Sequence, residues 1–380
     1  MKKSMKRIAA LLTAVILLAD GIAGCSGAGG NPAAPADQGQ NSGETYTFTC
    51  ANFYATVNNN SLLVEDWINE IATRSNGRIQ FEYYPGGSLV SAANSYDSVV
   101  NGVVDIAMTA TANTPGLFQA MSYLELPQGY PDGYVGTMVA NDFVNQFELD
   151  EFSSVKLLYT HTVSPLVILG NKEIRSLGDV KGTIIRTGSD LATDTVQALG
   201  GQSYSCQITE LYEALVKGIV DGAISGKDTL EGFGLSEVCK YVIDDPSYGK
   251  LGAVVMIMNP AKWSALPEDL QQIMTEVSVE FAEKHAKGWK YDDIVAYNQF
   301  EAKGGEIIKL APEASAEFTE KLQPVNQAYI DGLDKLTDEQ VAEYSGYIQE
   351  RIAYWSAQEP SEEEITSWYD EYLAPLAKES

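Results

Sequence analysis

Positive charge is scarce in this sequence. Its 380 residues hold 25 lysines and arginines against 52 aspartates and glutamates, for a formal net charge of −27. Removal of residues 1–24 would take away four basic residues and one acid, which leaves a charge of −30. A nucleic-acid-binding protein needs a basic face that displaces counterions, so the composition argues against that class. An anionic ligand would be repelled at long range, and its binding would require a locally placed cation.

Cysteine is almost as rare. Apart from Cys25, the cysteines are Cys50, Cys206 and Cys239, an odd number without a CxxC spacing. This pattern is not a disulfide framework, and we expect these residues to serve as small buried apolar side chains. The spacing leaves open whether Cys206 and Cys239 form a bridge.

No catalytic pattern is evident. The two histidines, His161 and His285, are far apart in the sequence and lack metal-ligand spacing, so we expect no metal and no cofactor. Residues 222–228 resemble a phosphate-binding loop, but they have one residue too few between the glycines and no Ser or Thr after Lys227. Ser225 directly precedes a glycine, which does not fit a GxSxG nucleophile motif. Paired carboxylates in so acidic a chain are mostly solvated surface, and we expect no enzyme.

The N-terminus has the pattern of an export signal. Four basic residues within positions 2–7 precede an apolar run at 8–19, which is too short to span a bilayer as a helix. The run leads to Ile22-Ala23-Gly24-Cys25, which resembles a bacterial lipobox. The resemblance implies cleavage before Cys25 and lipidation of its sulfur. A plain secretory signal that contains a cysteine is the alternative.

An internal repeat of a short sequence pattern favours two similar lobes. Helical and strand patterns alternate along the chain, as in α/β proteins. A predicted helix ending before Gly102 is followed by Val103-Val104-Asp105 and a short apolar strand, and the order recurs 116 residues later from Gly218 to Ile224. Each copy alone is what a helix followed by a buried parallel strand requires. The match in order and length favours two α/β lobes that face each other across a cleft.

Capping residues predict where several helices begin. Asn60 or Ser61 can cap a helix in the first part of the chain, and Thr209 is expected to cap the helix before Gly218. Ser361 and Glu364 have the spacing of a capping box, which predicts another helix start near the C-terminal end of the sequence.

The length of the chain supports the same division. About 335 residues follow the N-terminal segments, which is too many for one ordinary core. A helix of at least 25 residues is predicted from about Pro267, long enough to run along both lobes. The predicted boundaries are a lipoprotein signal peptide at 1–24, a disordered tether at 25–44, lobe I at 45–165 with a return segment near 250–285, lobe II at 166–249 with a return segment near 286–340, and a C-terminal helical extension at 341–380.

Arg186 is the one cation whose position suggests ligand binding. It stands at the end of a predicted strand that starts at Thr183, and Thr187-Gly188-Ser189 then leads into a helix. Ligands of open α/β sheets bind outside the carboxyl ends of strands, where a helix N-terminus favours anions. A guanidinium can bind a carboxylate through two parallel hydrogen bonds. An interlobe or surface ion pair is the alternative role for Arg186.

Several motifs, in order, resemble one transport family. The run from Ile174 to Arg186 is similar to the strand-and-arginine signature of the substrate-binding subunits of tripartite ATP-independent periplasmic (TRAP) transporters, also called DctP-type subunits. The resemblance covers roughly residues 46–335. Its other parts are Gly77 to Leu89, Gly102 to Asp105, Glu125-Leu126-Pro127, Glu210 to Gly222 and Trp263 to Gln271.

The resemblance implies a fold and a ligand class. It implies two α/β lobes of the type II periplasmic-binding-protein kind, joined by hinge strands and a long spine helix, that close over an organic acid. Arg186 lies where the family has the arginine that holds the ligand carboxylate. Ser225 stands where the family usually has asparagine, Gly226 where it has proline, and Leu166 where many members have a second arginine. These departures favour a monocarboxylate, or an acid with a sizeable apolar part, over a dicarboxylate.

Further contacts are expected from strand ends in lobe I. Asn52 and Phe53, followed by Tyr54, come after the first strand, and Thr109 and Thr111 come after the strand of the first repeat. They could supply polar and aromatic contacts to the ligand. The threonines could equally be ordinary β-branched residues of a sheet.

The sequence therefore predicts an extracytoplasmic, monomeric solute-binding lipoprotein. Its predicted partners are a small organic acid, TRAP membrane permease subunits and, through the lipid anchor, the cell membrane of either a Gram-positive surface or a periplasm. Two alternatives stay open: a binding protein of an ATP-driven importer or of a sensor kinase, and a surface-anchored hydrolase.

Overall fold

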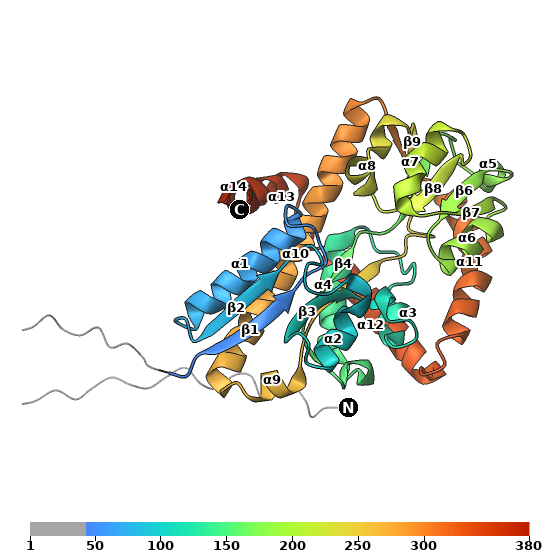
Figure 1. The fold of residues 1–380 in the computed structure, drawn as a ribbon. Helices are drawn as coiled ribbons and strands as arrows, with labels where there is room; N and C mark the ends of the chain where they lie inside the picture. The colour runs from blue at the N-terminus through green and yellow to red at the C-terminus, as the bar shows by residue number, and fades with distance from the viewer. Residues whose placement is uncertain (1–42, 380) are drawn as a thin grey trace, which may run out of the picture. The chain divides into compact units, whose positions relative to one another are not determined.

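The computed structural model describes residues 43–379 (Figure 1). The elements below all belong to the compact unit formed by residues 44–380. The predicted signal peptide at 1–24, Cys25 and nearly all of the predicted tether at 25–44 lie outside the described residues.

A five-stranded sheet forms the core of lobe I. Its strand order is β2-β1-β3-β10-β4. Strand β1 pairs in parallel with β2 and β3, whereas β10, which comes much later in the chain, pairs antiparallel with β3 and β4. The strands are β1 (Tyr46–Ala51), β2 (Ile79–Tyr84), β3 (Ile106–Ala110), β4 (Lys156–Val163) and β10 (Gly252–Met258).

A six-stranded sheet forms the core of lobe II. Its order is β11-β9-β5-β8-β6-β7. Strand β6 pairs in parallel with β7 and β8, and β5 pairs antiparallel with β8 and β9. The strands are β5 (Val167–Gly170), β6 (Ile184–Thr187), β7 (Gln202–Ser205), β8 (Gly222–Ser225), β9 (Tyr241–Ile243) and β11 (Glu306–Ile308).

Helices cover both faces of each sheet. In lobe I, buried side chains of α1 and α10 pack on one face, and those of α2, α3 and α4 pack on the other. In lobe II, α7, α8 and the end of α10 cover one face, and α5, α6 and α11 cover the other. The helices are α1 (Asn59–Arg74), α2 (Ser95–Val100), α3 (Gln119–Leu124), α4 (Gly133–Gln146), α5 (Leu177–Val180), α6 (Asp190–Ala198), α7 (Ile208–Val216), α8 (Thr229–Gly232), α9 (Pro260–Ser264), α10 (Glu268–Ala302) and α11 (Pro312–Asp331).

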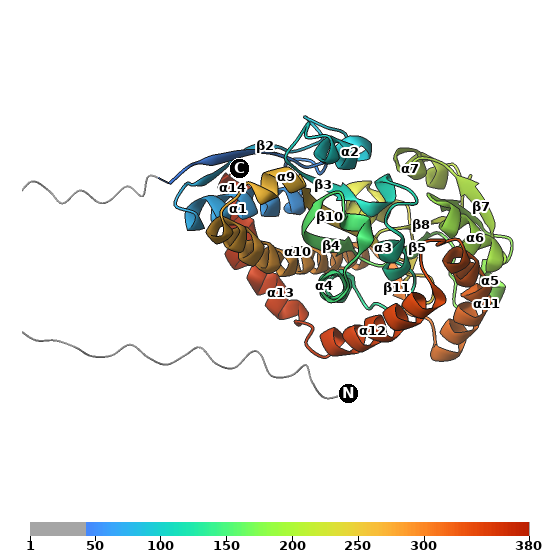
Figure 2. The same ribbon diagram turned by 90° about the horizontal axis from the view of Figure 1, so that it is seen from below.

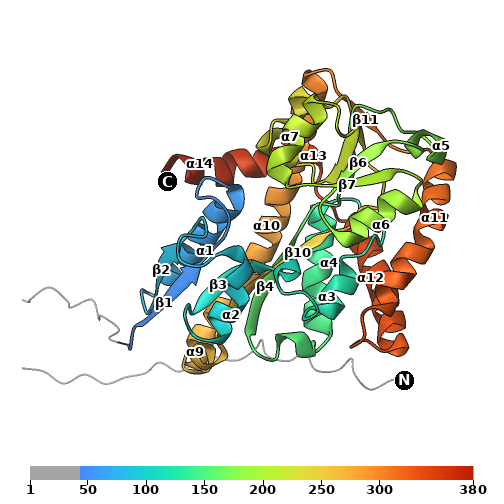
Figure 3. The ribbon, with the colours of Figure 1, turned by 45° about the vertical axis from the view of Figure 1, so that its right-hand side comes forward.

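The spine helix α10 joins the two lobes (Figure 3). It has 35 residues, which corresponds to about 52 Å at about 1.5 Å per residue. Phe281 is buried in the core of lobe I, and Phe300 is buried in that of lobe II. The predicted long helix is therefore confirmed, and it is longer than the minimum that the sequence suggested.

The C-terminal segment returns from lobe II to lobe I (Figure 2). After α11, helix α12 (Asp338–Ser356) packs on α3 and α4. Helix α13 (Glu362–Trp368) and α14 (Ala374–Glu379), joined by a π-helical turn, then contact α10 and α1. The predicted capping box of Ser361 and Glu364 is confirmed. No helix of the described part of the chain is long and apolar enough to cross a membrane.

Two helices begin at other residues than the sequence suggested. Asn58 caps α1, where we expected Asn60 or Ser61, because the Asn60 side chain is used elsewhere in a buried hydrogen bond. The N-cap of α7 is Gln207, which shares a capping box with Glu210. We expected Thr209, which lies inside the first turn.

Candidate functional site

Arg186 lies at the end of β6 and is buried. Only 8% of the residue is exposed. Its Nε donates a hydrogen bond to the backbone carbonyl of Cys206 at 3.0 Å, which fixes the plane of the guanidinium. Gly188 makes room for the two terminal nitrogens, because a Cβ atom at that position would lie 3.1 Å from Nη1.

No carboxylate neutralises Arg186 within the described residues. Each of the four other arginines in that part of the chain forms an ion pair with Asp or Glu. Those four are Arg74, Arg78, Arg175 and Arg351. Burial of a charge without a partner is costly. Arg186 is the most buried of the described arginines and the one without an ion pair, so its guanidinium can accept an anion from outside the chain.

Ser225 lies beside Arg186 on the same face of the sheet. Strands β6 and β8 are parallel neighbours, with Arg186 opposite Ala223. Side chains alternate along a strand, so Ser225 shares the face of Ala223 and Arg186. Ser225 is buried, and its hydroxyl has no hydrogen-bond partner among the described residues. These two predicted site residues are thus brought together at adjacent carboxyl ends of parallel strands.

The side chain of Asn52 is hydrogen-bonded to other residues of lobe I. Its Nδ2 donates to Ser61 Oγ at 2.9 Å and to the Tyr83 hydroxyl at 3.1 Å, and its Oδ1 accepts from the backbone N–H of Tyr54 at 3.1 Å. These bonds fix the turn that follows β1. Asn52 therefore positions the next two side chains, Phe53 and Tyr54.

Phe53 and Tyr54 form a half-buried aromatic pair. Their ring centroids lie 4.3 Å apart. The Tyr54 ring also lies 6.3 Å from that of His161 and 6.5 Å, edge-on, from that of Trp289. Aromatic surface is therefore present where lobe I meets α10.

Thr109 and Thr111 are engaged within lobe I. Thr109 lies inside β3 and is fully buried. Thr111 Oγ1 donates to the Glu125 carboxylate and also lies 3.2 Å from the carbonyl oxygen of Ala253. Both lie on the face of the sheet that α2, α3 and α4 cover, whereas Asn52 bonds to α1 on the opposite face. The structure does not group these threonines with Asn52.

The two histidines, distant in the sequence, stack on each other. Their ring centroids lie 4.5 Å apart with planes 5° apart. Trp289 Nε1 donates to His161 Nδ1 at 3.0 Å, which places the proton of this imidazole on Nε2. His161 Nε2 is buried without a partner among the described residues, and burial lowers the pKa of His161 to about 3. Sequence spacing gave no signal for this contact, and no group of residues in the described part of the chain could hold a metal ion.

A charged network surrounds the crossing of α10 between the lobes. Lys227 is buried and lies 3.4 Å from Asp244 and 3.5 Å from Asp293. Lys290 contacts Asp132 of lobe I at 3.1 Å and also Glu359 of the C-terminal segment. These groups line a cavity of about 700 Å³. The network links both lobes, the spine helix and the C-terminal segment.

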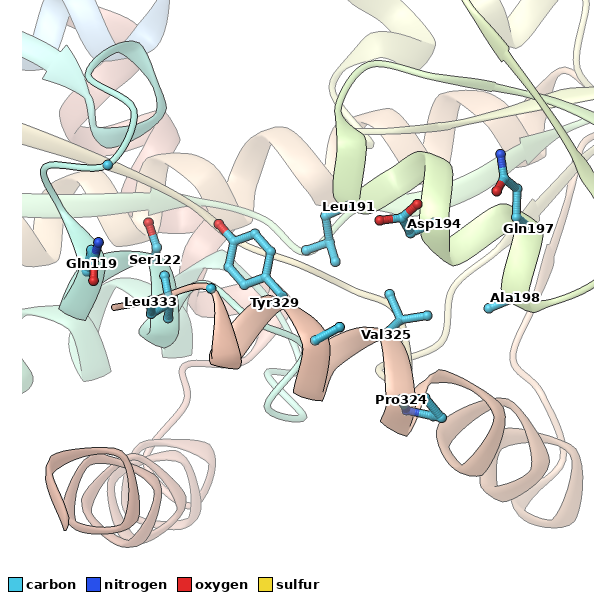
Figure 4. A pocket seen from close by; sticks show the side chains of 13 residues that line it. Gln119, Ser122, Leu191, Asp194, Gln197, Ala198, Pro324, Val325, Tyr329 and Leu333 are labelled. Atoms are coloured by element: carbon cyan, nitrogen blue, oxygen red, sulfur yellow. The ribbon is translucent and has the colours of Figure 1, made fainter. Parts of the chain in front are cut away.

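An apolar groove also lies between the lobes (Figure 4). It has a volume of about 690 Å³ and is bordered by α3, α6 and α11. Leu191, Val325 and Tyr329 line it, while Gln119 and Asp194 supply polar groups. Neither Arg186 nor Ser225 lines this groove.

Comparison with known proteins agrees with this arrangement. Residues 55–331 match the family described as bacterial extracellular solute-binding protein, family 7 (DctP). The chain belongs to this family. The resemblance to TRAP substrate-binding subunits that the motifs predicted is therefore confirmed, as is the two-lobe α/β fold.

Relatives of this DctP-family chain include proteins with assigned ligands. A C4-dicarboxylate-binding protein, DctB, of Bacillus subtilis is 23% identical and aligns with 70% of this chain and 75% of its own length. A monocarboxylate 2-oxoacid-binding periplasmic protein of Nostoc is 24% identical, over 68% of this chain and 69% of its own.

Solved structures share the fold of this DctP-family chain. A TRAP periplasmic solute-binding protein from Desulfovibrio salexigens, described as an open complex, has a TM-score of 0.77 at 24% identity and covers 83% of this chain and 98% of its own. A TRAP solute-binding protein from Rhodoferax ferrireducens, in complex with copurified benzoate, has a TM-score of 0.70 at 25% identity, with coverages of 83% and 100%.

Proposed function

We propose that this DctP-family chain is an extracytoplasmic lipoprotein that captures a small monocarboxylate with an apolar or aromatic part and delivers it to TRAP membrane subunits. One observation carries the proposal: Arg186 is a buried guanidinium at a strand end without a carboxylate partner in the described residues. A ligand carboxylate would supply the missing counter-charge.

Arg186 is arranged to bind a carboxylate with two hydrogen bonds. The Cys206 carbonyl occupies Nε, which leaves the two terminal nitrogens for the ligand. Parallel N–H···O bonds to one carboxylate give both strength and orientation. The Ser225 hydroxyl on the same face supplies a further donor, in place of the larger amide that the family usually has there. Closure of the two lobes would exclude water from this pair.

The surroundings support one carboxylate over two. Leu166 occupies the position at which many family members carry a second arginine. The backbone N–H of Leu166 bonds to the carbonyl of Lys250, but the Lys250 ammonium is ion-paired with Glu125. Lys250 is therefore neutralised, and a second ligand carboxylate would have no obvious counter-charge from this residue.

Two similar proteins of solved structure have aromatic acids as ligands, although the relative from Bacillus subtilis is named for C4-dicarboxylates. The Rhodoferax ferrireducens protein holds benzoate, and a marine metagenome TRAP protein that is 22% identical is described as specific for aromatic acid ligands. The aromatic pair of Phe53 and Tyr54 offers this chain a comparable surface for an apolar ligand part. Since the family comprises solute-binding proteins, we propose that the chain releases its ligand unchanged.

The first experiment is a thermal-shift screen of the purified protein against small organic acids, followed by titration calorimetry. A ligand at 100 times its dissociation constant adds about 2.7 kcal/mol to the free energy of unfolding. Loss of one partner of a buried charge pair costs about 2–5 kcal/mol, so Arg186→Ala should weaken binding about 30-fold or more. Arg175→Ala, which removes an exposed arginine paired with Glu173 and Glu306, is the matched control. Unchanged affinity in Arg186→Ala, or a response to sugars or peptides alone, would refute the proposal.

A further inference from the structure

Two carboxylates close to the proposed site also lack a counter-charge. Asp228 follows β8 three residues after Ser225, and Asp292 lies on α10. Neither forms an ion pair with any described residue. The lysines close to them in the sequence pair with other acids: Lys227 with Asp244 and Asp293, and Lys290 with Asp132.

Asp228 is held against the end of β8. Its Oδ1 lies 2.2 Å from the position that a Cβ atom of residue 226 would take, so glycine at that position makes room for the carboxylate. Gly226 directly follows Ser225, and β8 is the parallel neighbour of β6. Asp228 is exposed, yet burial by surrounding protein raises its pKa. This combination is expected of a carboxylate on a concave wall. The unpaired guanidinium of Arg186 thus lies at the end of β6, and the unpaired carboxylate of Asp228 follows the adjacent end of β8.

Asp292 faces the same region from the spine helix. It lies three residues after Trp289 and four before Ala296, so the three share one face of α10. Trp289 contacts the ring of Tyr54 in lobe I, whereas Ala296 is buried in the core of lobe II. Asn59 Nδ2 donates to Asp292 Oδ1 at 2.6 Å, and the described residues supply no donor to Oδ2. Asp292 therefore stands where the helix crosses between the lobes.

Tyr54 lies within electrostatic range of both carboxylates. Burial, followed by the nearby charges of Asp228 and Asp292, raises the pKa of the Tyr54 hydroxyl. Burial also raises the pKa of Asp292 to about 7, against the hydrogen bond from Asn59, and the charges of Asp293 and Asp228 add to the rise. An aromatic ring close to acidic groups of lobe II and α10 attracts a cation, through both charge and the face of the ring.

A ligand with only negative charge fits this region poorly. Its carboxylate would satisfy Arg186, but it would add a third negative group near two that already lack a partner. A positively charged group on the same ligand would satisfy both acids. The guanidinium of Arg186 at one end of the region and the acidic and aromatic groups at the other are therefore complementary to a molecule that carries both charges.

We propose that the ligand of this protein is a zwitterion, whose carboxylate binds Arg186 and whose substituted ammonium binds Asp228, Asp292 and the ring of Tyr54. This inference rests on the proposed function and narrows it, since the ligand remains a monocarboxylate with an apolar part. Asp228 and Asp292 are then the residues that decide specificity against simple acids.

Isosteric ligand pairs test the proposal by titration calorimetry. Trimethylammonioacetate is compared with 3,3-dimethylbutanoate, 4-trimethylammoniobutanoate with 5,5-dimethylhexanoate, and phenylalanine with 3-phenylpropanoate. The first two pairs differ only in a nitrogen for a carbon. We expect the ammonium member of at least one pair to bind about 30-fold tighter than its partner, in line with a partly buried charge pair. Asp228→Asn and Asp292→Asn should each reduce that preference about tenfold or more, without weakening the uncharged partner.

Asp194→Asn, which removes an exposed acid of α6 in the same lobe, is the matched control and should leave the preference unchanged. Equal or tighter binding of the uncharged partner in every pair, with binding still lost in Arg186→Ala, overturns this inference and leaves the proposed function standing. Binding that Arg186→Ala does not weaken, or no binding of any carboxylate in this panel or among the simple acids, overturns the proposed function itself.

Discussion

Gly188 lies directly against the guanidinium of Arg186. A Cβ atom at residue 188 would stand 3.1 Å from Nη1, 3.2 Å from Nη2 and 3.3 Å from Cζ. Such distances are tighter than ordinary van der Waals contacts, so an alanine would push the guanidinium away from its position. Because Nε is bonded to the Cys206 carbonyl at 3.0 Å, a displacement of the guanidinium would strain that bond.

Gly188→Ala should therefore weaken ligand binding without unfolding the protein. Overpacking typically costs about 1–3 kcal/mol, which corresponds to about a 5- to 150-fold loss of affinity if it falls on the bound orientation of Arg186. Titration calorimetry measures the affinity, and the thermal unfolding midpoint reports the fold. Gly178→Ala, whose Cβ would meet only Ser176 Oγ at 3.5 Å, is the control. Full affinity in Gly188→Ala would show that the guanidinium can bind from another position.

Glu151 should make stability depend on pH. It accepts hydrogen bonds from the backbone N–H groups of Ala120 and Met121 at 2.8 and 3.1 Å, in the first turn of α3. Burial nevertheless raises the pKa of Glu151 to about 7. A carboxyl group with a raised folded-state pKa stabilises the fold fully below its unfolded pKa of about 4.3, and this contribution is lost as pH rises to about 7.

Glu151→Gln removes this titration. Relative to the variant, the wild-type protein should lose free energy of unfolding, on the order of 2 kcal/mol, between pH 4.5 and pH 7.5. Urea unfolding at several pH values measures the difference. Glu148→Gln, at an exposed acid close in the sequence, should track the wild type. A difference between wild type and Glu151→Gln that is constant with pH would mean that Glu151 stays ionised throughout.

The C-terminal segment should be part of the cooperative fold. Ile348 of α12 is fully buried in the same cluster as Phe143 of α4 and Tyr344. Removal of a buried isoleucine side chain beyond Cβ costs about 2–5 kcal/mol, so Ile348→Ala should lower the free energy of unfolding by that amount. Val279→Ala, at a position of α10 that is 61% exposed, should change it little. A single unfolding transition with Ile348→Ala as stable as the wild type would show that α12 is only loosely attached.

The internal repeat could be predicted from the sequence, and the structure explains why both copies contain an aspartate. Asp105 Oδ2 accepts from the backbone N–H of Thr49 at 2.9 Å, and Asp221 Oδ2 accepts from that of Ile184 at 2.9 Å. In each lobe the aspartate thus binds a backbone N–H of the neighbouring parallel strand. The helix-to-strand pattern of the sequence reveals the glycine and the aspartate. It does not reveal the strand that the aspartate contacts, because that strand lies dozens of residues away.

The candidate site was only partly visible in the sequence. Arg186 could be singled out because few cations are available and because a strand, a glycine and a helix surround it. Asp228 and Asp292 could not, since acids are abundant and these two lie 64 residues apart. The stacked pair of His161 and His285 was missed because the two residues lie 124 positions apart in the sequence, and the observation that would have helped is a tertiary contact between β4 and α10.

Helix starts were misplaced where neighbouring residues have equal capping ability. Asn58, Asn59 and Asn60 are consecutive, and local chemistry cannot choose among them. The choice follows from tertiary contacts, because Asn59 bonds to Asp292 and Asn60 bonds to His285. Asn58 is left to cap the helix.

Cys25 carries the last prediction, which concerns the membrane. If the lipobox resemblance holds, cleavage exposes Cys25 as the N-terminal residue and two acyl chains anchor the protein, and two chains suffice for stable attachment. Cys25→Ser should therefore move the protein from the membrane fraction to the soluble extracytoplasmic fraction or the medium, with ligand binding unchanged. Cys206→Ser, at a thiol that is free in the structure, should stay with the membrane. Membrane retention of Cys25→Ser after cleavage of the signal would contradict the lipoprotein assignment, while the binding function argued from Arg186 would be unaffected.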